Sequence, residues 1–173
     1  MYRMKKIITS LFLLLMSLKC LSQGFAAYEV KSFIDKGAEV VVDNSFAAYE
    51  IKSFASKNAS LVTVIGKGFA AYEVKSFIDK GAEVVVDNSF AAYEIKSFAS
   101  KNASLVTVIG KGFAAYEVKS FIDKGAEVVV DNSFAAYEIK SFASKNASLV
   151  TVIGKGFAAY EVKSFIDKGA EVV

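Results

Sequence analysis

The 173-residue chain contains no histidine, and its only cysteine is Cys20. Without histidine, no imidazole is present to act as a general base. A single cysteine cannot form a disulfide within the chain, and it cannot build a zinc site of the usual cysteine and histidine kind. Histidine-dependent catalysis, a disulfide framework and a Cys/His metal centre are therefore excluded by composition.

The first 23 residues differ from the rest of the chain. Three basic residues precede an apolar run over residues 7–18, and Cys20 and Ser22 place small side chains near its end. This layout is typical of a secretory signal peptide. The run is shorter than the roughly 20 residues that a membrane-spanning helix needs. We expect residues 1–23 to be cleaved, leaving no membrane span; lipidation of Cys20 is the alternative.

Charge is divided unevenly between this segment and the remainder. Four of the 21 basic residues lie in residues 1–23, and none of the 18 acidic residues do. The remainder therefore carries 17 basic and 18 acidic side chains, a net charge of −1. The alkaline isoelectric point of the chain is therefore due to the basic residues of the N-terminal segment. Since the remainder has no excess of basic residues to bind phosphates, we expect no nucleic-acid partner.

The rest of the chain is a perfect tandem repeat with a period of 44 residues. Full copies begin at Gly24, Gly68 and Gly112, and a partial copy begins at Gly156. Self-similarity at a fixed period is the mark of a repeat architecture. We predict a single tandem-repeat domain over residues 24–173.

Each copy contains two related halves of about 22 residues, which open at Phe25 and Phe46 in the first copy. FAAYEVKSFID and FAAYEIKSFASKN have the apolar spacing of amphipathic helices. AEVVVD and ASLVTVIG are short and rich in β-forming residues. Strand, helix and strand joined by short links predict parallel pairing through right-handed crossovers.

The predicted fold class is therefore α/β. We expect a right-handed βα solenoid of tandem ~22-residue units, with a parallel sheet on one surface and amphipathic helices on the other. The alternative is a closed or doubly wound α/β domain. Two local contacts are also expected: Ser45 should cap the helix that follows it, and Glu29 and Lys31 should form ion pairs between neighbouring helices.

The segment Val40-x-Val42-x-Asn44-x-Phe46 resembles the strand motif of leucine-rich repeat proteins. The resemblance implies a non-catalytic binding scaffold with a concave parallel sheet. The expected binding residues lie on the sheet face away from the helices: Glu39, Val41, Asp43, Glu83, Val85, Asp87, Glu127, Val129 and Asp131.

A second motif joins a strand to a helix through Gly66-Lys67-Gly68, with Ala71 and Asp87 further along. It is similar to the dinucleotide-binding fingerprint of Rossmann domains, which implies a pyrophosphate at the helix N-terminus and an acid on the ribose. The cofactor-binding residues of this alternative are Gly66, Gly68, Ala71, Asp87, Gly110, Gly112, Ala115 and Asp131.

Taken together, these patterns predict an exported, non-catalytic repeat protein without a cofactor or metal, located in the periplasm, at the cell surface or outside the cell. Its partner would be another protein or a cell-surface component. End-to-end self-association is also expected, because neither end of the repeat has a polar cap. The alternatives are nucleotide binding at the GKG turns, and a partial or recently expanded reading frame without an evolved function.

Overall fold

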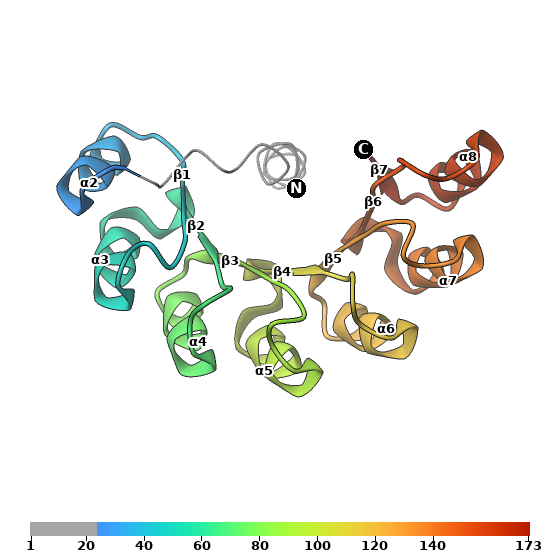
Figure 1. Cartoon of the computed structure of the whole chain (residues 1–173), viewed down its shortest axis with the longest axis horizontal. Helices are drawn as coiled ribbons and strands as arrows, with labels where there is room; N and C mark the ends of the chain where they lie inside the picture. Colours follow the sequence, from blue (N-terminus) through green and yellow to red (C-terminus); the bar gives the residue numbers. More distant parts are fainter. Residues whose placement is uncertain (1–23) are drawn as a thin grey trace.

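The computed structural model describes residues 24–173, which form one curved parallel sheet with its helices (Figure 1). The predicted signal peptide, residues 1–23, lies outside the described residues. Strands and helices alternate along the whole described chain. Across residues 24–173, no helix combines the length and apolar character needed to cross a membrane.

Within residues 24–173, seven strands and seven helices recur with nearly constant bounds. The strands are β1 (Val40–Val42), β2 (Val62–Ile65), β3 (Glu83–Val86), β4 (Val106–Ile109), β5 (Glu127–Val130), β6 (Val150–Val152) and β7 (Glu171–Val172). The helices are α2 (Ala27–Asp35), α3 (Ala48–Asn58), α4 (Ala71–Asp79), α5 (Ala92–Asn102), α6 (Ala115–Asp123), α7 (Ala136–Asn146) and α8 (Ala159–Asp167). Short 3₁₀ turns lead from α3, α5 and α7 into the next strand: η1 (Ala59–Leu61), η2 (Ala103–Leu105) and η3 (Ala147–Leu149).

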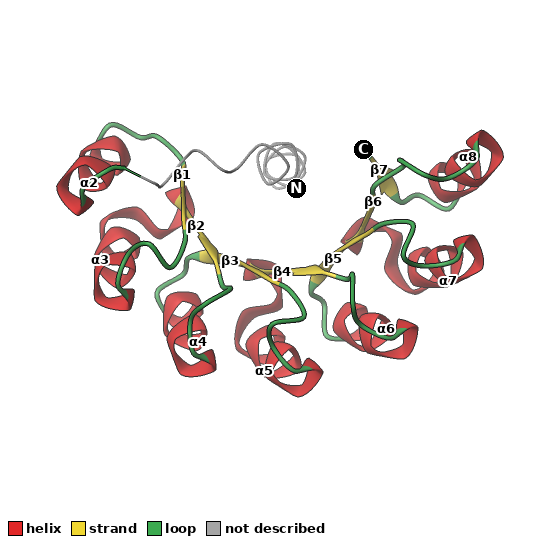
Figure 2. Ribbon diagram, in the orientation of Figure 1, coloured by secondary structure: helices red, strands yellow, loops and turns green. Residues whose placement is uncertain are grey.

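The sheet follows the order of the sequence. Its strand order is β1-β2-β3-β4-β5-β6-β7, and every neighbouring pair is parallel. The strands line the inside of an arc, and the helices α2 to α8 lie outside it (Figure 2). The α/β fold with an all-parallel sheet alternating with helices is thus confirmed. The doubly wound alternative is wrong, because such a fold would place helices on both faces of the sheet.

The strand register carries a regular offset. Val41 of β1 lies opposite Thr63 of β2, and Thr63 in turn lies opposite Glu83 of β3. Glu83 is the counterpart of Glu39 in the next copy, so the register moves by two residues over each pair of strands. The same step recurs from Val85 through β4 to β5.

The core lies between the sheet and the helices, and each unit contributes one phenylalanine at its centre. Phe54 and Phe98 are fully buried, and the valines that flank them on the sheet, such as Val62 and Val64, are 0–1% exposed. Each buried ring meets the phenylalanine that opens its unit edge to face, as Phe46 meets Phe54 at 5.3 Å between centroids. Edge-to-face pairs of this kind add about 0.5–1.5 kcal/mol beyond the area that they bury.

The helices begin two residues later than expected, and glutamate rather than serine satisfies their first backbone group. Ala47 is the N-terminal cap residue of α3, and its N–H donates to Oε2 of Glu50 at 2.9 Å. Ser45 does not cap the helix, because the cap position falls two residues later, at Ala47; the backbone N–H of Ser45 donates to Oδ1 of Asp43 at 2.9 Å. The prediction for Ser45 is therefore wrong.

Ion pairs between neighbouring helices are present, but the expected residues do not make them. Lys57 of α3 pairs with Asp35 of α2 at 3.1 Å, and the next two copies repeat this contact. Glu29 instead accepts a hydrogen bond from the N–H of Ala26 at the start of its own helix. The pairs are about half exposed, so each contributes roughly 0–1 kcal/mol.

Truncation of the central phenylalanine should test how far the fold depends on it. Phe98→Ala is expected to lower the free energy of unfolding by about 3–5 kcal/mol, because it leaves a cavity that the rigid sheet cannot fill. Tyr93→Ala on the same helix is the control: its side chain is 74% exposed, so the change should stay within about 0.5 kcal/mol. Urea unfolding followed by circular dichroism measures both. Equal losses would contradict this account of the core.

Candidate functional site

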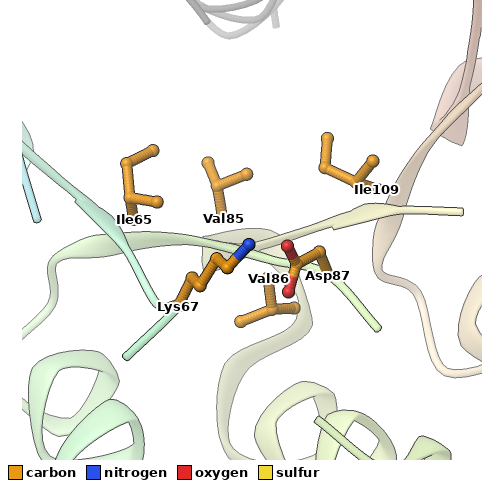
Figure 3. Close-up of a pocket in the computed structure, with 6 residues that line it drawn as sticks. All are labelled: Ile65, Lys67, Val85, Val86, Asp87 and Ile109. Carbon is orange, nitrogen blue, oxygen red and sulfur yellow. The ribbon is translucent and has the colours of Figure 1, made fainter. Parts of the chain in front are cut away.

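The candidate site is the concave face of the sheet, where alternate strand residues point away from the helices. In β3, Val84 and Val86 pack beneath the helices at 1% exposure, so Glu83, Val85 and Asp87 face the other way. Figure 3 shows Val85 directed into the arc and Val86 directed toward the helices. The nine residues expected on the free sheet face lie in or directly beside β1, β3 and β5. Val85 and Val129, however, are only 4% and 3% exposed, so these two cannot form part of an open binding surface.

A hollow on this face lies at the carboxyl ends of β2, β3 and β4. It is lined by Ile65, Lys67, Val85, Val86, Asp87 and Ile109. Its volume is about 90 Å³, well below the roughly 300–1,000 Å³ of small-molecule sites. Lys67 and Asp87 point toward one another at its rim (Figure 3). The hollow thus suits one extended side chain better than a nucleotide.

A row of glutamates crosses the concave face, one from every second strand: Glu39, Glu83, Glu127 and Glu171. Burial, followed by the carboxylates of Glu83 and Glu171, raises the pKa of Glu127 to about 7. Burial and the Glu39 carboxylate also raise the pKa of Glu83, while a hydrogen bond with Thr63 lowers it. Neighbouring carboxylates in the row are therefore close enough to repel one another.

Threonine residues separate these glutamates, and they were not anticipated as part of the site. Thr63 and Thr151 are 8% and 5% exposed, and Thr107 holds the equivalent place on β4. The sequence does carry a signal for them, because threonine is the one polar residue inside LVTVIG. Period-two alternation alone could not locate it, since that strand is apolar on both faces.

The glycines of the GKG turns serve the packing of the turns. Gly68 has φ +89°, and a Cβ on it would overlap the side chain of Asn44 in the preceding turn. A Cβ on Gly66 would lie 3.0 Å from Val86 and 3.4 Å from Phe90. The same contacts recur at Gly110 and Gly112 in the next copy. Close approach of protein atoms therefore accounts for glycine at these positions.

The resemblance to the Rossmann fingerprint is corrected by the geometry around these turns. A Rossmann site lies where the strand order reverses, and this sheet runs from β1 to β7 without a reversal. The helix N-terminus that would receive a pyrophosphate already has an anion, because the N–H of Ala70 donates to Oε2 of Glu73 at 2.9 Å. Asp87 lies at the hollow beside Lys67. Ala71 is the first residue of α4.

The outer surface carries a second repeated feature, a tyrosine in the first turn of each helix. All seven are 72–74% exposed: Tyr28, Tyr49, Tyr72, Tyr93, Tyr116, Tyr137 and Tyr160. Their equal exposure shows that neighbouring helices do not cover them. Within residues 24–173, no three Asp, Glu, His or Cys side chains converge closely enough to hold a metal ion.

Comparisons with known proteins assign no family to this chain. No family model and no curated protein matches it. Solved structures that match include a provisionally assigned lyase/mutase of Burkholderia cenocepacia J2315 (12% identity, 85% of this chain, 72% of that chain, TM-score 0.44). Others are a provisionally assigned fructose-1,6-bisphosphate aldolase of Coccidioides immitis (10%, 85%, 67%, 0.45) and a provisionally assigned phosphonomutase of B. cenocepacia J2315 (12%, 86%, 82%, 0.44). Similarity at this level assigns no activity.

The resemblance to leucine-rich repeat proteins is wrong. The matching structures named above are described as a lyase/mutase, an aldolase and a phosphonomutase. The structural reason lies at Asn44, which would have to be buried to form an asparagine ladder between units. Asn44, Asn88 and Asn132 are all exposed in the turns at the carboxyl ends of their strands. The short motif around Val40 therefore reflects a strand and a turn, and no ladder.

Stability should depend on pH through Glu127. Its pKa rises from the ordinary 4.5 to about 7 on folding, so the folded state holds a proton that the unfolded state releases between these values. The free energy of unfolding should therefore fall as pH rises from about 4.5 to 7 and then level off, by roughly 2 kcal/mol after solvent screening.

Urea unfolding at pH 4 to 8 measures this slope. Glu127→Gln should remove most of it and be more stable than the parent chain at pH 8. Glu39→Gln is the matched control at the exposed end of the row. It should keep the part of the slope that comes from Glu127, on which Glu39 does not act directly, and reduce only the part that comes from Glu83. A parent chain whose stability rises over this interval would contradict the assignment.

Proposed function

We propose that the chain is an exported, non-catalytic binding scaffold, a right-handed βα solenoid that presents its concave sheet face to a partner. The partner would be a protein or cell-surface component with regularly spaced cations on an extended backbone. The observation that carries the proposal is the row of mutually interacting glutamates on the concave face.

The repetition of the face supports binding over catalysis. An active site brings unlike groups together at one point, whereas the same three side chains recur here at β1, β3 and β5. A ligand that is itself periodic makes each contact several times, and such contacts add through effective concentration. A single small molecule would occupy one unit only, and the hollow there is small.

The spacing of the row defines the partner further. Glutamates on every second strand are about 12 Å apart: about 10 Å across the sheet, because neighbouring strands lie about 4.8 Å apart, and about 6.6 Å along it, because of the two-residue register offset. A polyproline II helix advances about 9.3 Å every three residues and returns its side chains to the same face. The long, flexible side chain of a lysine at every third residue of such a chain would reach successive glutamates.

Titration calorimetry with the peptide (Lys-Pro-Pro)₄ tests this at pH 8 and low salt. We expect binding that weakens with salt and is lost in Glu83→Gln/Glu127→Gln, because the row then loses its central charges. Tyr93→Ser/Tyr137→Ser alters the outer surface and should bind normally. A peptide of equal composition with its four lysines in one block should bind more weakly. Equal affinity for the two peptides, or for the glutamine variant, would refute the proposal.

Nucleotide binding at the GKG turns is a separate prediction with its own test. Titration with NAD, FAD and ATP is expected to show no micromolar binding, because Glu73 already occupies the helix N-terminus. Asp87→Asn is the informative variant, since any substitution of Gly68 would strain a backbone at φ +89°. Micromolar binding that Asp87→Asn abolishes would favour nucleotide binding over the scaffold function.

A further inference from the structure

The two halves of each repeat copy have different strands but share one helix segment, FAAYE-x-KSF, in which x is valine or isoleucine. Their strand segments AEVVVD and SLVTVI have just two valines in common, so that Val41 of β1 lies opposite Thr63 of β2. Residues that are the same in both halves while their surroundings differ call for a physical reason at each position.

The fold accounts for most positions of the shared segment. Its phenylalanines lie in the core, as Phe46 and Phe54 do at 6% and 0% exposure. Its glutamate accepts a hydrogen bond from the N–H that begins the helix, as Glu50 does from Ala47. Its serine bonds to a backbone carbonyl in α4, α6 and α8. No such contact explains its tyrosine or its lysine within residues 24–173, where the tyrosines are 72–74% exposed.

The lysines of the shared segment are not part of any ion pair in the described chain. They are Lys31, Lys52, Lys75, Lys96, Lys119, Lys140 and Lys163. The ion pairs between helices use a different lysine, such as Lys57, near the end of its helix. The glutamate two positions before each lysine, such as Glu29 before Lys31, bonds at the helix N-terminus instead. Each helix therefore presents one exposed ring and one unpaired cation.

The tyrosine and the lysine of each helix lie side by side. They are three residues apart, as Tyr93 and Lys96 are, which places their Cβ atoms about 5–6 Å apart on the helix surface. The pair recurs about every 10 Å, because packed helices lie about 8–10 Å apart. Since α2 to α8 all lie outside the arc (Figure 2), the seven pairs form one row along the outer surface, the Tyr–Lys stripe.

A ring beside a cation suits an acidic sugar. The apolar C–H face of a sugar ring stacks on the phenol ring, the phenolic O–H bonds to sugar hydroxyls, and the ammonium group pairs with a carboxylate. Because the pair is repeated on every helix, the fitting partner is a polymer, whose weak contacts add through effective concentration.

The interval between lysines narrows the kind of polymer further. One cation about every 10 Å is too sparse for a nucleic-acid strand, which carries a phosphate about every 3.4 Å. Two linked sugar rings are roughly as long as a helix with its side chains is wide, about 10–12 Å. A polysaccharide with a carboxylate on every second sugar therefore matches the stripe.

We propose that the Tyr–Lys stripe binds an acidic polysaccharide in which carboxylate-bearing and neutral sugars alternate. Each tyrosine stacks on a sugar ring, and each lysine pairs with a carboxylate. The stripe lies on the opposite surface from the concave face, whose glutamates would repel such a chain. The proposal therefore does not rest on the scaffold function of that face, and either can fail without the other.

Titration calorimetry with a hyaluronate oligosaccharide long enough to span several helices tests the stripe on the 173-residue chain. We expect binding at low salt that weakens as salt is added. Two control polymers separate the contributions of ring and charge. Carboxyl-reduced hyaluronate has the rings without the charge, and poly-L-glutamate has the charge without the rings. Each should bind at least about tenfold more weakly than hyaluronate.

Variants on alternate helices leave no two neighbouring pairs intact. Tyr49→Ala/Tyr93→Ala/Tyr137→Ala removes three exposed rings, and the same triple change to phenylalanine keeps them. The alanine variant should bind hyaluronate at least about tenfold more weakly than the parent chain, whereas the phenylalanine variant should stay within about threefold of it. Circular dichroism confirms that each variant is folded.

Charge is tested in the same way. Lys52→Gln/Lys96→Gln/Lys140→Gln should also weaken binding at least about tenfold, and it breaks none of the described ion pairs. Glu83→Gln/Glu127→Gln changes the concave face alone and should leave hyaluronate binding intact.

The proposal is overturned if hyaluronate does not bind, if poly-L-glutamate or the carboxyl-reduced polymer binds equally well, or if the alanine or the glutamine triple variant binds like the parent chain. The last result would assign the binding to the basic residues of segment 1–23, which every variant retains. Tighter binding of single-stranded DNA than of hyaluronate would also overturn it and would identify a nucleic-acid surface instead. Loss of hyaluronate binding in Glu83→Gln/Glu127→Gln would place the site on the concave face and refute the stripe.

Discussion

The burial of one helix face against one sheet face is the constraint on which the rest of the structure depends. Each helix offers a single apolar stripe, and its central phenylalanine, such as Phe77 or Phe121, is fully buried on the valines of the sheet. In the units of β1, β3, β5 and β7 only the valine face can accept that stripe, because the other face carries carboxylates. All helices must therefore lie on one side, and the sheet bends with its uncovered face inward.

This one-sidedness also sets the electrostatics of the inner face. Curvature brings inward side chains closer together than the strands that carry them, so carboxylates from β3 and β5 lie where water is partly excluded. Desolvation is accordingly the largest cause of the raised pKa at both Glu83 and Glu127. Two residues in identical sequence contexts nevertheless differ in their neighbours: Glu39 acts on the first, while Glu83 and Glu171 act on the second.

Much of the fold could be predicted from the sequence, because the spacing of apolar residues along short segments identifies each helix and strand. Helical spacing in FAAYEVKSFID and alternation in AEVVVD identify the elements, and short links between them require parallel strands. The registers could not be read in this way, nor could the partner of Lys57, because a 22-residue separation in sequence says nothing of how two helices are shifted along each other. The cap was assigned to Ser45 for a related reason: a serine can also hydrogen-bond within the turn before the helix, as the hydroxyl of its counterpart Ser133 does when it donates to Asp131.

The sequence was sufficient to predict most residues of the candidate site, but not how these residues interact with one another. Alternation placed Glu83, Val85 and Asp87 on the uncovered face, as the structure has them. Thr63 was hidden because both faces of its strand are apolar, and the interaction between glutamates depends on curvature, which no residue pattern states. For the glycine motif, the sequence suggested a function where packing is a sufficient explanation. The glycine spacing suggested a bound nucleotide, whereas the close approach of the Asn44 side chain to Gly68 already accounts for glycine at this position.

The two-residue offset between strand pairs has a geometric consequence. Four such pairs, eight strands in all, would accumulate a stagger of about eight residues, which is the shear at which eight parallel strands close into a (βα)₈ barrel. An open arc and a closed barrel of these units would thus share one register. What separates them is the bend between neighbouring strands, and the inward glutamates resist that bend whenever they are ionised.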